Sequence, residues 1–445
     1  MAIRIPAAPI TPLLRRMITR SLAAVHAGTA VRRAVRRDGE ILTVGSSRYD
    51  LRRYDRVAVV GAGKAAAQMA REMERLLGRR LHRGLVIVKH GHAIPTKRIV
   101  VEEAGHPVPD RAGLVATRRL RDLASSLSGR DLLIVLLSGG ASSLLPAPVP
   151  GLTLADKQRV TRQLLRCGAG IAEINTVRKH LSMLKGGRLA ESTKATVITL
   201  ILSDVLGDDL SAIASGPTAP DPTTYGDAIA ALHRCRIWSA TPRSVRRQLR
   251  AGARGRFGET PKPGSGIFKR VQNIIVGNNQ SALSALTSVA RQAGFRTILH
   301  SARVTGEARV EGAKFGALAR GLFGRGARAS KPCCLVAGGE TTVTVRGAGA
   351  GGRAQEFAVG AATAIAGLPD VWVAAIGSDG TDGPTDVAGA LVSGGTRARA
   401  HRLGVDLDNA LRRNDTFAAL KRLRCHIKTG PTGTNVNDLY LLFVL

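Results

Sequence analysis

The chain has 445 residues, of which 44% are hydrophobic and 22% charged, and this composition suits two or three globular domains. Lysine and arginine number 66 against 32 aspartates and glutamates, so the formal net charge is +34. Only 3% of residues are aromatic, and no zinc-finger, RNA-recognition or basic-zipper pattern occurs, which argues against a protein that stacks nucleic-acid bases on aromatic side chains. We interpret the excess arginine as spread over solvent-facing surfaces, where it attracts anionic substrates.

The N-terminal segment from Ile3 to Arg37 is rich in arginine and has no acidic residue before Asp38. It resembles an organelle transit peptide. However, its apolar residues recur at helical spacing, which favours a basic amphipathic helix of the mature protein. These apolar residues are Leu13, Leu14, Met17, Ile18, Leu22 and Val25.

The five cysteines are scattered without a CxxC pair, which indicates a reducing compartment. No apolar run reaches the roughly 18 residues that span a bilayer. We therefore expect a cytoplasmic protein without a membrane partner.

Short apolar runs alternate with helical patterns through the first half of the chain. Such runs predict buried strands of a mostly parallel sheet, with helices on both faces. The predicted strands are Val57–Val60, Gly84–Val88, Asp131–Leu137 and Thr196–Leu202. Each strand leads into Gly, Ser, Asp or basic residues, and ligands bind beyond the carboxyl ends of strands in such sheets.

The second half of the chain predicts a separate α/β unit. Residues 241–266 are rich in Arg, Gly and Pro and are interpreted as a connection between lobes or as a mobile surface excursion. A strand over Asn273–Gly277 and a helix over Ser281–Gly294 follow, and Asp438–Leu445 is predicted to be a terminal core strand. The expected domains are 1–240, 241–330 and 331–445.

The turn Gly61-Ala62-Gly63-Lys64 follows a strand and opens a helix, so its N–H groups and Lys64 suit an anion. It lacks the spacing of a Walker A loop. It does fit the looser G-x-G-x-x-A pattern of dinucleotide sites, although Lys89 and His90 stand where that pattern requires an acidic residue. Close packing of helix on strand explains the glycines as well.

The loop after the third strand, with Ser138, Gly139, Gly140 and Ser142, offers hydroxyls and N–H groups to a phosphate or small carboxylate. No partnership with His and Asp indicates a serine nucleophile. On a helix over 175–187, the basic residues at positions 178 and 185 would share one face that binds an anion. Solvated basic side chains are the alternative.

A second glycine-rich loop, Gly347–Gly352, opens a helix at Arg353, whose planar guanidinium can bind phosphate oxygens in pairs. Glu340 follows the predicted strand Cys334–Ala337, and another predicted strand, Thr341–Val345, precedes this loop.

The segment Ile376–Asp386 carries Asp379, Asp382 and Asp386 after a buried strand. Carboxylates in this arrangement are typical Mg²⁺ ligands, and a solvated turn is the alternative. Asp204 follows another strand. Two glycine loops, two cations and clustered aspartates are the components of phosphoryl transfer.

Taken in order, these motifs resemble the bacterial-type glycerate 2-kinases over nearly the whole chain, and the last block resembles the C-terminal domain named MOFRL. The family also includes proteins labelled hydroxypyruvate reductases. The matching motifs are Gly61–Lys64, His106–Asp110, Leu137–Gly140, Asn175–Lys179, Leu202–Asp204, Ser215–Thr218, Ala337–Thr341, Gly351–Arg353, Gln355–Glu356, Gly377–Asp386 and Thr429–Asp438.

The resemblance implies ATP-dependent phosphorylation of D-glycerate to 2-phospho-D-glycerate with Mg²⁺. It implies an α/β fold of two lobes, an N-terminal Rossmann-like α/β/α domain and a C-terminal α/β MOFRL-type domain, with the active site in the cleft between them. The family's lysine and arginine match Lys64 and Arg353. Asp204 is the candidate to accept the hydroxyl proton, and Asp379, Asp382 and Asp386 are the candidate Mg²⁺ ligands. The expected substrate- and phosphate-binding residues are Gly61, Gly63, Ser138, Gly139, Gly140, Ser142, Arg178, Glu340, Gly351 and Gly352.

The chain departs from the family at Ala354, where asparagine is usual, and in a serine loop that is poorer in glycine. An NAD(P)H-dependent hydroxypyruvate reductase is the alternative function, and nucleic-acid binding rests on charge alone. The expected partners are glycerate, a nucleotide and a second copy of the chain in a homodimer, with no specific nucleic acid.

Overall fold

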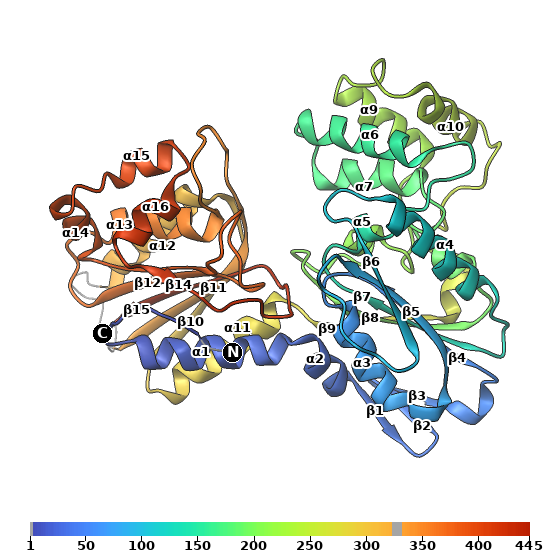
Figure 1. The fold of residues 1–445 in the computed structure, drawn as a ribbon, viewed down its shortest axis with the longest axis horizontal. Helices are drawn as coiled ribbons and strands as arrows, with labels where there is room; N and C mark the ends of the chain where they lie inside the picture. Colours follow the sequence, from blue (N-terminus) through green and yellow to red (C-terminus); the bar gives the residue numbers. More distant parts are fainter. Residues whose placement is uncertain (1–2, 323–331) are drawn as a thin grey trace. The chain divides into compact units, whose positions relative to one another are not determined.

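The computed structural model describes residues 3–322 and 332–445 and divides into two compact α/β units (Figure 1). Unit 1 comprises Met1–His26 and Gly277–Leu445, and unit 2 comprises Ala27–Val276. These limits differ from the expected 1–240, 241–330 and 331–445, because the first helix packs with the C-terminal unit and residues 241–276 complete unit 2. The expected boundary at 330 lies outside the described residues.

The centre of unit 2 is a six-stranded sheet in the order β6-β5-β4-β7-β8-β9. All four strand pairs from β6 to β8 are parallel, and every residue of β4 and β7 is buried. The predicted parallel sheet is therefore confirmed. The strands are β4 (Val57–Ala62), β5 (Leu81–Lys89), β6 (Ile99–Ala104), β7 (Leu132–Leu137), β8 (Thr196–Leu202) and β9 (Val271–Gly277).

Helices and a small antiparallel sheet surround this sheet in unit 2. Apolar residues from β4, β5, β7, β8 and α4 form one shared core on one of its faces. The helices around the sheet are α2 (Ala27–Ala34), α3 (Ala66–Leu77), α4 (Arg111–Ser125), α5 (Ala141–Leu144) and α8 (Arg188–Glu191). The small sheet is β1 (Val35–Asp38), β2 (Ile41–Val44) and β3 (Ser47–Asp50). Short 3-10 turns occur at Leu51–Arg53, Gly78–Arg80, Ile213–Ser215 and Gly266–Arg270.

Four helices of unit 2 form a separate helical layer with its own apolar core, seen at the top of Figure 1. They are α6 (Leu154–Arg166), α7 (Ile171–His180), α9 (Tyr225–Arg234) and α10 (Arg243–Ala253). The interpretation of 241–266 as a mere connection is wrong for α10. This helix buries Val245 and Leu249, four residues apart, and its Gly252 lies directly against the ring of Tyr225.

Unit 1 contains a second six-stranded sheet, in the order β10-β11-β15-β12-β13-β14. The last strand of the chain, β15, lies in the middle of this sheet and pairs antiparallel with both β11 and β12. The predicted terminal core strand is thus confirmed. The strands are β10 (Arg296–Glu307), β11 (Cys333–Thr342), β12 (Val371–Gly377), β13 (Gly389–Ser393), β14 (His426–Ile427) and β15 (Asp438–Val444).

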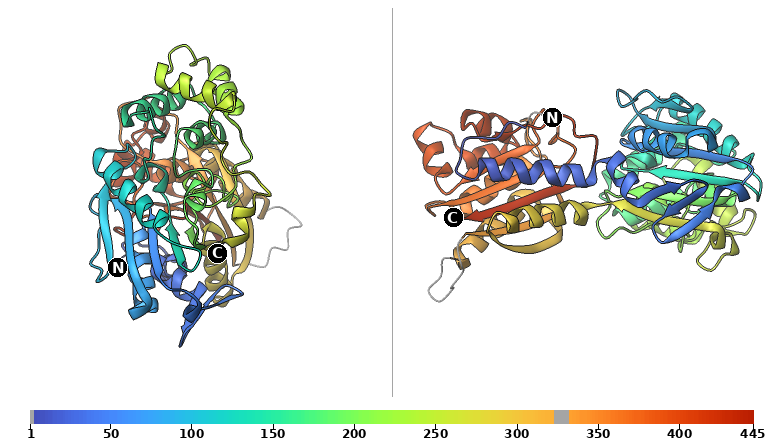
Figure 2. Two further views of the ribbon diagram at one scale, coloured as in Figure 1. Left: turned by 90° about the vertical axis from the view of Figure 1, so that its right-hand side faces the viewer. Right: turned by 90° about the horizontal axis from the view of Figure 1, so that it is seen from below.

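Helices cover both faces of this sheet. In Figure 1, α1 (Thr11–Val25) and α11 (Asn279–Gln292) lie together below it, and the right-hand view of Figure 2 looks onto that face. The other face is covered by helices that include α12 (Ala308–Leu322) and α13 (Arg353–Ala364). The shorter helices are α14 (Thr396–Arg402), α15 (Leu407–Arg412) and α16 (Thr416–Arg422).

The amphipathic N-terminal helix predicted from the sequence is α1. It buries the apolar side chains of Leu14, Met17, Ile18, Leu22 and Val25 and belongs to unit 1. Among the described residues, no helix is both long enough and apolar enough to cross a membrane.

Helices α12 and α13 approach each other through glycines. A Cβ at Gly312 would overlap the carbonyl oxygen of Phe357, and one at Gly360 would overlap that of Arg309. We predict that Gly312→Ala lowers the free energy of unfolding by about 1–3 kcal/mol, because the helices must separate to admit the methyl group.

Gly321, near the end of α12, is the matched control because no neighbouring atom of the described residues lies within 4 Å of the place that a Cβ would take there. Gly321→Ala should raise the free energy of unfolding by about 0.4–1 kcal/mol, since alanine restricts the unfolded chain. Urea unfolding of both variants measures the difference. Equal effects of the two substitutions would contradict close packing at Gly312.

Candidate active site

In unit 2, three predicted site loops lie at one edge of the parallel sheet. They follow β4, β7 and β8, which are neighbours, so their carboxyl ends meet. The backbone N–H of Lys64 donates to the carbonyl of Gly139 at 2.9 Å, and the N–H of Ala65 donates to Ser138 Oγ at 3.0 Å. The structure therefore brings the Lys64 turn and the serine loop together.

The glycines of the Lys64 turn are required by this close approach. A Cβ at Gly61 would overlap the carbonyl of Leu136. Gly63 has a φ of +136°, and a Cβ there would overlap Ser138. Packing by itself thus accounts for both glycines, and their role in anion binding stays a prediction.

The serine loop is also tied to α7 and to a lysine beyond it. Ser142 Oγ lies 2.8 Å from Ser215 Oγ, and Ser215 Oγ donates to Asn175 Oδ1 at 3.0 Å. Lys185 Nζ donates to the backbone carbonyl of Ser142 at 2.8 Å. These bonds fix the loop against the helical layer, so the hydroxyl-bearing segment is held in one conformation.

His106 begins the matching motif His106–Asp110 and is a member of this site, although it was not among the expected site residues. Its ring lies against Gly140, where a Cβ would come within 3.0 Å of Nε2. Burial, with the nearby charges of Lys64 and Lys89, lowers the pKa of His106 to about 4. His106 is therefore a neutral imidazole at pH 7, able to accept or donate one hydrogen bond beside the predicted anion site.

The expected helix face with Arg178 and Lys185 forms in a different way. Helix α7 ends at His180, so Lys185 lies in the turns beyond it rather than on the same helix. The two charges nevertheless interact, since the charge of Arg178 helps to lower the pKa of the buried Lys185. The next residue, Lys179, forms a buried ion pair with Asp221 at 3.2 Å.

Asp204 follows β8 and is half-buried at the same edge of the sheet. Its neighbour in the loop, Asp209, accepts the backbone N–H of Ser211 and so shapes the turn. The position of Asp204 agrees with the expected one, and its role as a proton acceptor stays a prediction.

In unit 1, Arg353 is the centre of a carboxylate network. It is the first residue of α13; its Nε lies 2.8 Å from Asp438 Oδ2, and its NH1 donates to Glu340 Oε1 at 2.7 Å. Glu340 lies near the end of β11 and Asp438 begins β15, and these strands are neighbours. Two acids on adjacent strands therefore orient the guanidinium, whose side chain keeps 32% of its surface exposed.

Asp438 is buried, and sequence reasoning did not assign it to the site. Burial raises its pKa to about 7; Arg353 opposes this shift and Asp382 adds to it. Tyr440 Oη donates to Asp438 at 3.1 Å, and burial raises the pKa of Tyr440 well above its usual value. The signal that the sequence offers for Asp438 is a carboxylate directly before an apolar strand.

The three aspartates of the Gly377–Asp386 loop have different partners. Asp382 caps the first turn of α13, because its carboxylate accepts the N–H of Ala354 at 3.0 Å and both the N–H and Nε2 of Gln355 at 2.9 and 3.0 Å. Asp386 pairs with Lys428 at 2.7 Å, which lowers the pKa of Asp386. Asp379 accepts the N–H of Thr381 at 3.1 Å.

These aspartates do not fit a shared metal site as they stand. Over residues 3–322 and 332–445, no group of three or more His, Cys, Asp or Glu side chains is arranged to hold a metal ion. Asp382 is occupied by N–H donors, which compete with a cation for its oxygens. Ligation of Mg²⁺ by Asp379, Asp382 and Asp386 stays a prediction.

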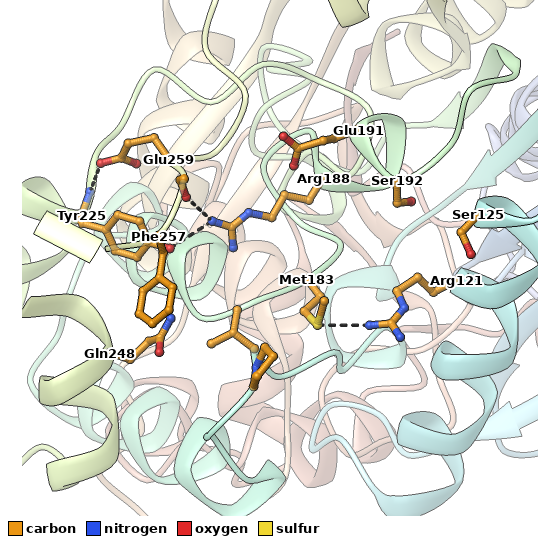
Figure 3. A pocket seen from close by; sticks show the side chains of 13 residues that line it. Arg121, Ser125, Met183, Arg188, Glu191, Ser192, Tyr225, Gln248, Phe257 and Glu259 are labelled. Atoms are coloured by element: carbon orange, nitrogen blue, oxygen red, sulfur yellow. Dashed lines mark hydrogen bonds between the residues drawn. The ribbon is translucent and has the colours of Figure 1, made fainter. Parts of the chain in front are cut away.

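A pocket of about 450 Å³ in unit 2 lies apart from the predicted residues (Figure 3). Arg121 donates to Met183 Sδ on one side, and Arg188 donates to Tyr225 Oη and the carbonyl of Gly258 on the other. None of the predicted site residues lines this pocket. We therefore place the candidate active site at the strand-end loops.

The fold and these loops define a class of two-unit α/β proteins with cationic side chains at sheet edges. Residues 13–250 match the family described as "Domain of unknown function (DUF4147)", and residues 333–438 match the MOFRL family. The chain belongs to the family of glycerate 2-kinases that combine these two domains.

Three relatives illustrate this membership. A protein of Pyrococcus horikoshii named glycerate 2-kinase is 38% identical over 96% of both chains. The crystal structure of a glycerate kinase from Thermotoga maritima matches with a TM-score of 0.85 at 39% identity, over 98% of this chain and 99% of that one. A relative from Agrobacterium vitis, 40% identical over 87% of each chain, carries the provisional name of hydroxypyruvate reductase.

The titration of Asp438 predicts a pH-dependent stability. Its folded pKa of about 7 exceeds the ordinary value of 3.8, so between these pH values the folded state retains a proton that the unfolded chain has lost. Protonation of Asp438 therefore contributes fully to stability below pH 3.8, and this contribution is lost as pH rises through about 7.

The melting temperature of the wild type minus that of Asp438→Asn should therefore decrease as pH rises from about 4, and it should become constant above about pH 8. Thermal unfolding of both proteins across this range measures it. The asparagine has no such titration, so a difference that is independent of pH would contradict the raised pKa.

Proposed function

We propose that this protein transfers the γ-phosphoryl group of ATP to the 2-hydroxyl of D-glycerate. The main support is its similarity to proteins named glycerate 2-kinase over nearly the whole chain. The local support is the placement of Lys64 beside the serine loop, at the carboxyl ends of β4 and β7. Such edges bind phosphorylated ligands in parallel α/β sheets.

Each side chain in the proposal has a role that follows from its surroundings. Lys64 supplies a positive charge on a turn whose backbone is fixed by Gly139. Arg353, oriented by Glu340 and Asp438, supplies planar N–H donors to phosphoryl oxygens. Asp204 accepts the proton of the substrate hydroxyl. Because phosphoryl transfer develops charge on oxygen, both cations contribute through stabilisation of the transition state.

Mg²⁺ as the companion of ATP, the cytoplasm as the compartment and a homodimer as the assembly also belong to the proposal. The metal is supported by the chemistry of phosphoryl transfer, because Mg²⁺ would neutralise negative charge on the phosphate oxygens. The compartment is supported by free cysteines throughout the described chain.

Replacing either cation should reduce turnover strongly while the protein stays folded. We expect Lys64→Ala and Arg353→Ala to lower kcat, the latter by about 10³–10⁵-fold if it acts as arginines do in other phosphoryl transfers. A coupled assay of ADP release measures kcat with D-glycerate, L-glycerate and tartronate, and identification of the product decides which hydroxyl is phosphorylated.

Arg353→Ala leaves the buried Asp438 without its cation, so Arg353→Lys is the second variant, which keeps the charge but not the planar donors. Lys314→Ala, at an exposed surface pair with Glu311, is the control and should match the wild type. Near-normal kinase activity in both Lys64→Ala and Arg353→Lys would refute the assignment.

The metal ligands are tested separately. If Asp379, Asp382 and Asp386 bind Mg²⁺, each Asp→Asn substitution should raise the Mg²⁺ concentration needed for half-maximal activity. Asp382 also caps α13, so its substitution should lower the melting temperature even in EDTA. An unchanged Mg²⁺ requirement in one variant would remove that aspartate from the ligand set.

The second candidate function, reduction of hydroxypyruvate by NAD(P)H, is favoured by the G-x-G-x-x-A turn and by the name of the Agrobacterium vitis relative. Incubation with hydroxypyruvate and NADPH, followed by the absorbance of NADPH, tests it. Oxidation of NADPH at a rate comparable to the kinase reaction would support this candidate.

A further inference from the structure

Three cationic side chains meet in unit 2 where the helical layer packs on the loop after β7. Lys157 lies on α6, Arg178 on α7 and Lys185 in the turns beyond α7. The charges of Lys157 and Arg178 both lower the pKa of Lys185, and Arg178 also lowers that of Lys157, so the three charges interact. We call these three residues the cation cluster.

Two members of the cation cluster are buried, and the third, Arg178, is half-buried. Lys157 is 8% exposed and Lys185 is 2% exposed. Burial is the first cause that lowers the pKa of all three residues, to about 7 for Lys157. No carboxylate is among those causes, so within the described residues the cluster has no compensating acid.

One member of the cluster is unpartnered. Lys157 Nζ is buried and has no hydrogen-bond partner among the described residues. A buried lysine side chain that makes no hydrogen bond is unfavourable whether it is protonated or neutral, and such groups are rare in native proteins. An oxygen of a bound anion would satisfy it.

Neighbouring cations show that the surroundings could have provided partners. Lys179 pairs with Asp221 at 3.2 Å, and Arg188 donates to the carbonyl of Ser182 at 2.7 Å and to Tyr225 Oη at 3.1 Å. The lack of a partner at Lys157 is therefore a local feature of the cluster. It is not a general property of this basic segment.

The cluster is connected to the candidate active site by direct bonds. Lys185 Nζ donates to the carbonyl of Ser142, and Ser142 Oγ is bonded to Ser215 Oγ. Ser142 belongs to the loop that follows β7, whose first residues contact the Lys64 turn. An anion held by the cluster would thus lie behind the serine loop, on the side of the helical layer.

We propose that Lys157, Arg178 and Lys185 bind the carboxylate of the acid substrate, between the helical layer and the serine loop of unit 2. Because two of its three members are buried, the cluster suits a small planar anion better than a polyphosphate chain. Three cations against one carboxylate also select acids over uncharged polyols that carry the same hydroxyls. This assignment rests on the proposed function, since it names the part of the acceptor that the cluster holds.

The first test uses the whole protein and needs no activity. Lys157→Met replaces the ammonium by an apolar side chain of similar length. If Lys157 lacks a partner until a ligand binds, this variant should melt at the same or a higher temperature than the wild type without ligand, because a buried polar group without a partner is removed. D-glycerate should raise the melting temperature of the wild type and leave that of Lys157→Met unchanged.

Arg162→Met is the matched control, because Arg162 lies on the same helix outside the cluster and is not among its buried residues. It should respond to D-glycerate as the wild type does. Lys157→Gln, which keeps a donor without the charge, serves as the second variant if Lys157→Met does not fold.

The second test measures kinetics. Lys157→Met should raise the KM for D-glycerate by about 10- to 100-fold, the loss expected for one hydrogen bond to a charged group, and leave the KM for ATP unchanged. The ratio of kcat/KM for D-glycerate to that for glycerol, which lacks the carboxylate, should fall by a similar factor.

The remaining outcomes are decisive. If inorganic phosphate or ATP stabilises the wild type through Lys157 while D-glycerate does not, the cluster is a phosphate site and the carboxylate assignment fails. If Lys157→Met keeps a normal KM for D-glycerate in an active kinase, the inference fails and the proposed function stands. If the protein has no kinase activity but D-glycerate still stabilises it through Lys157, the anion site stands and the proposed function fails.

Discussion

The close approach of two turns at the edge of the unit 2 sheet is the constraint on which the candidate site depends. The chain leaving β4 passes so near the chain leaving β7 that Gly61 and Gly63 admit no side chain. Two backbone N–H groups, of Lys64 and Ala65, donate across this contact and hold it. A lysine, several hydroxyls and the carboxyl ends of two strands are thereby fixed within one small region.

The two units differ in the groups that surround their cationic side chains. In unit 1, Arg353 lies between Glu340 and Asp438, so the cation is compensated by acids from adjacent strands. In unit 2, Lys157 has no acid or hydrogen bond to compensate it among the described residues. Paired acids hold a cation in one orientation. A buried cation without a paired acid is instead stabilised when it binds an anion.

The net charge of +34 does not by itself identify the function of the protein. Many arginines serve local structure: Arg56 pairs with the buried Asp131, and Arg270 donates to the carbonyls of Ala190 and Thr193. Others lie on exposed helix faces, as in the segment 243–256 that lines an open arginine-rich surface. The cations proposed to bind ligands are few: Lys64 and Arg353 are half-buried, and Lys157 is buried.

Sequence patterns alone predicted β4, β5, β7, β8, β9 and β15, the amphipathic α1, the glycine turns and the family, because buried strands, helical spacing and motif order are local or linear patterns. They did not predict β6, β10, β13 or β14. They also could not determine the role of Asp382 as a helix cap, the burial of Asp438 beside Arg353, or the isolation of Lys157. Each of these depends on which groups from distant segments surround a charge. Hydrogen-bond partners and desolvation are set by tertiary packing, and they decide what a charged residue does.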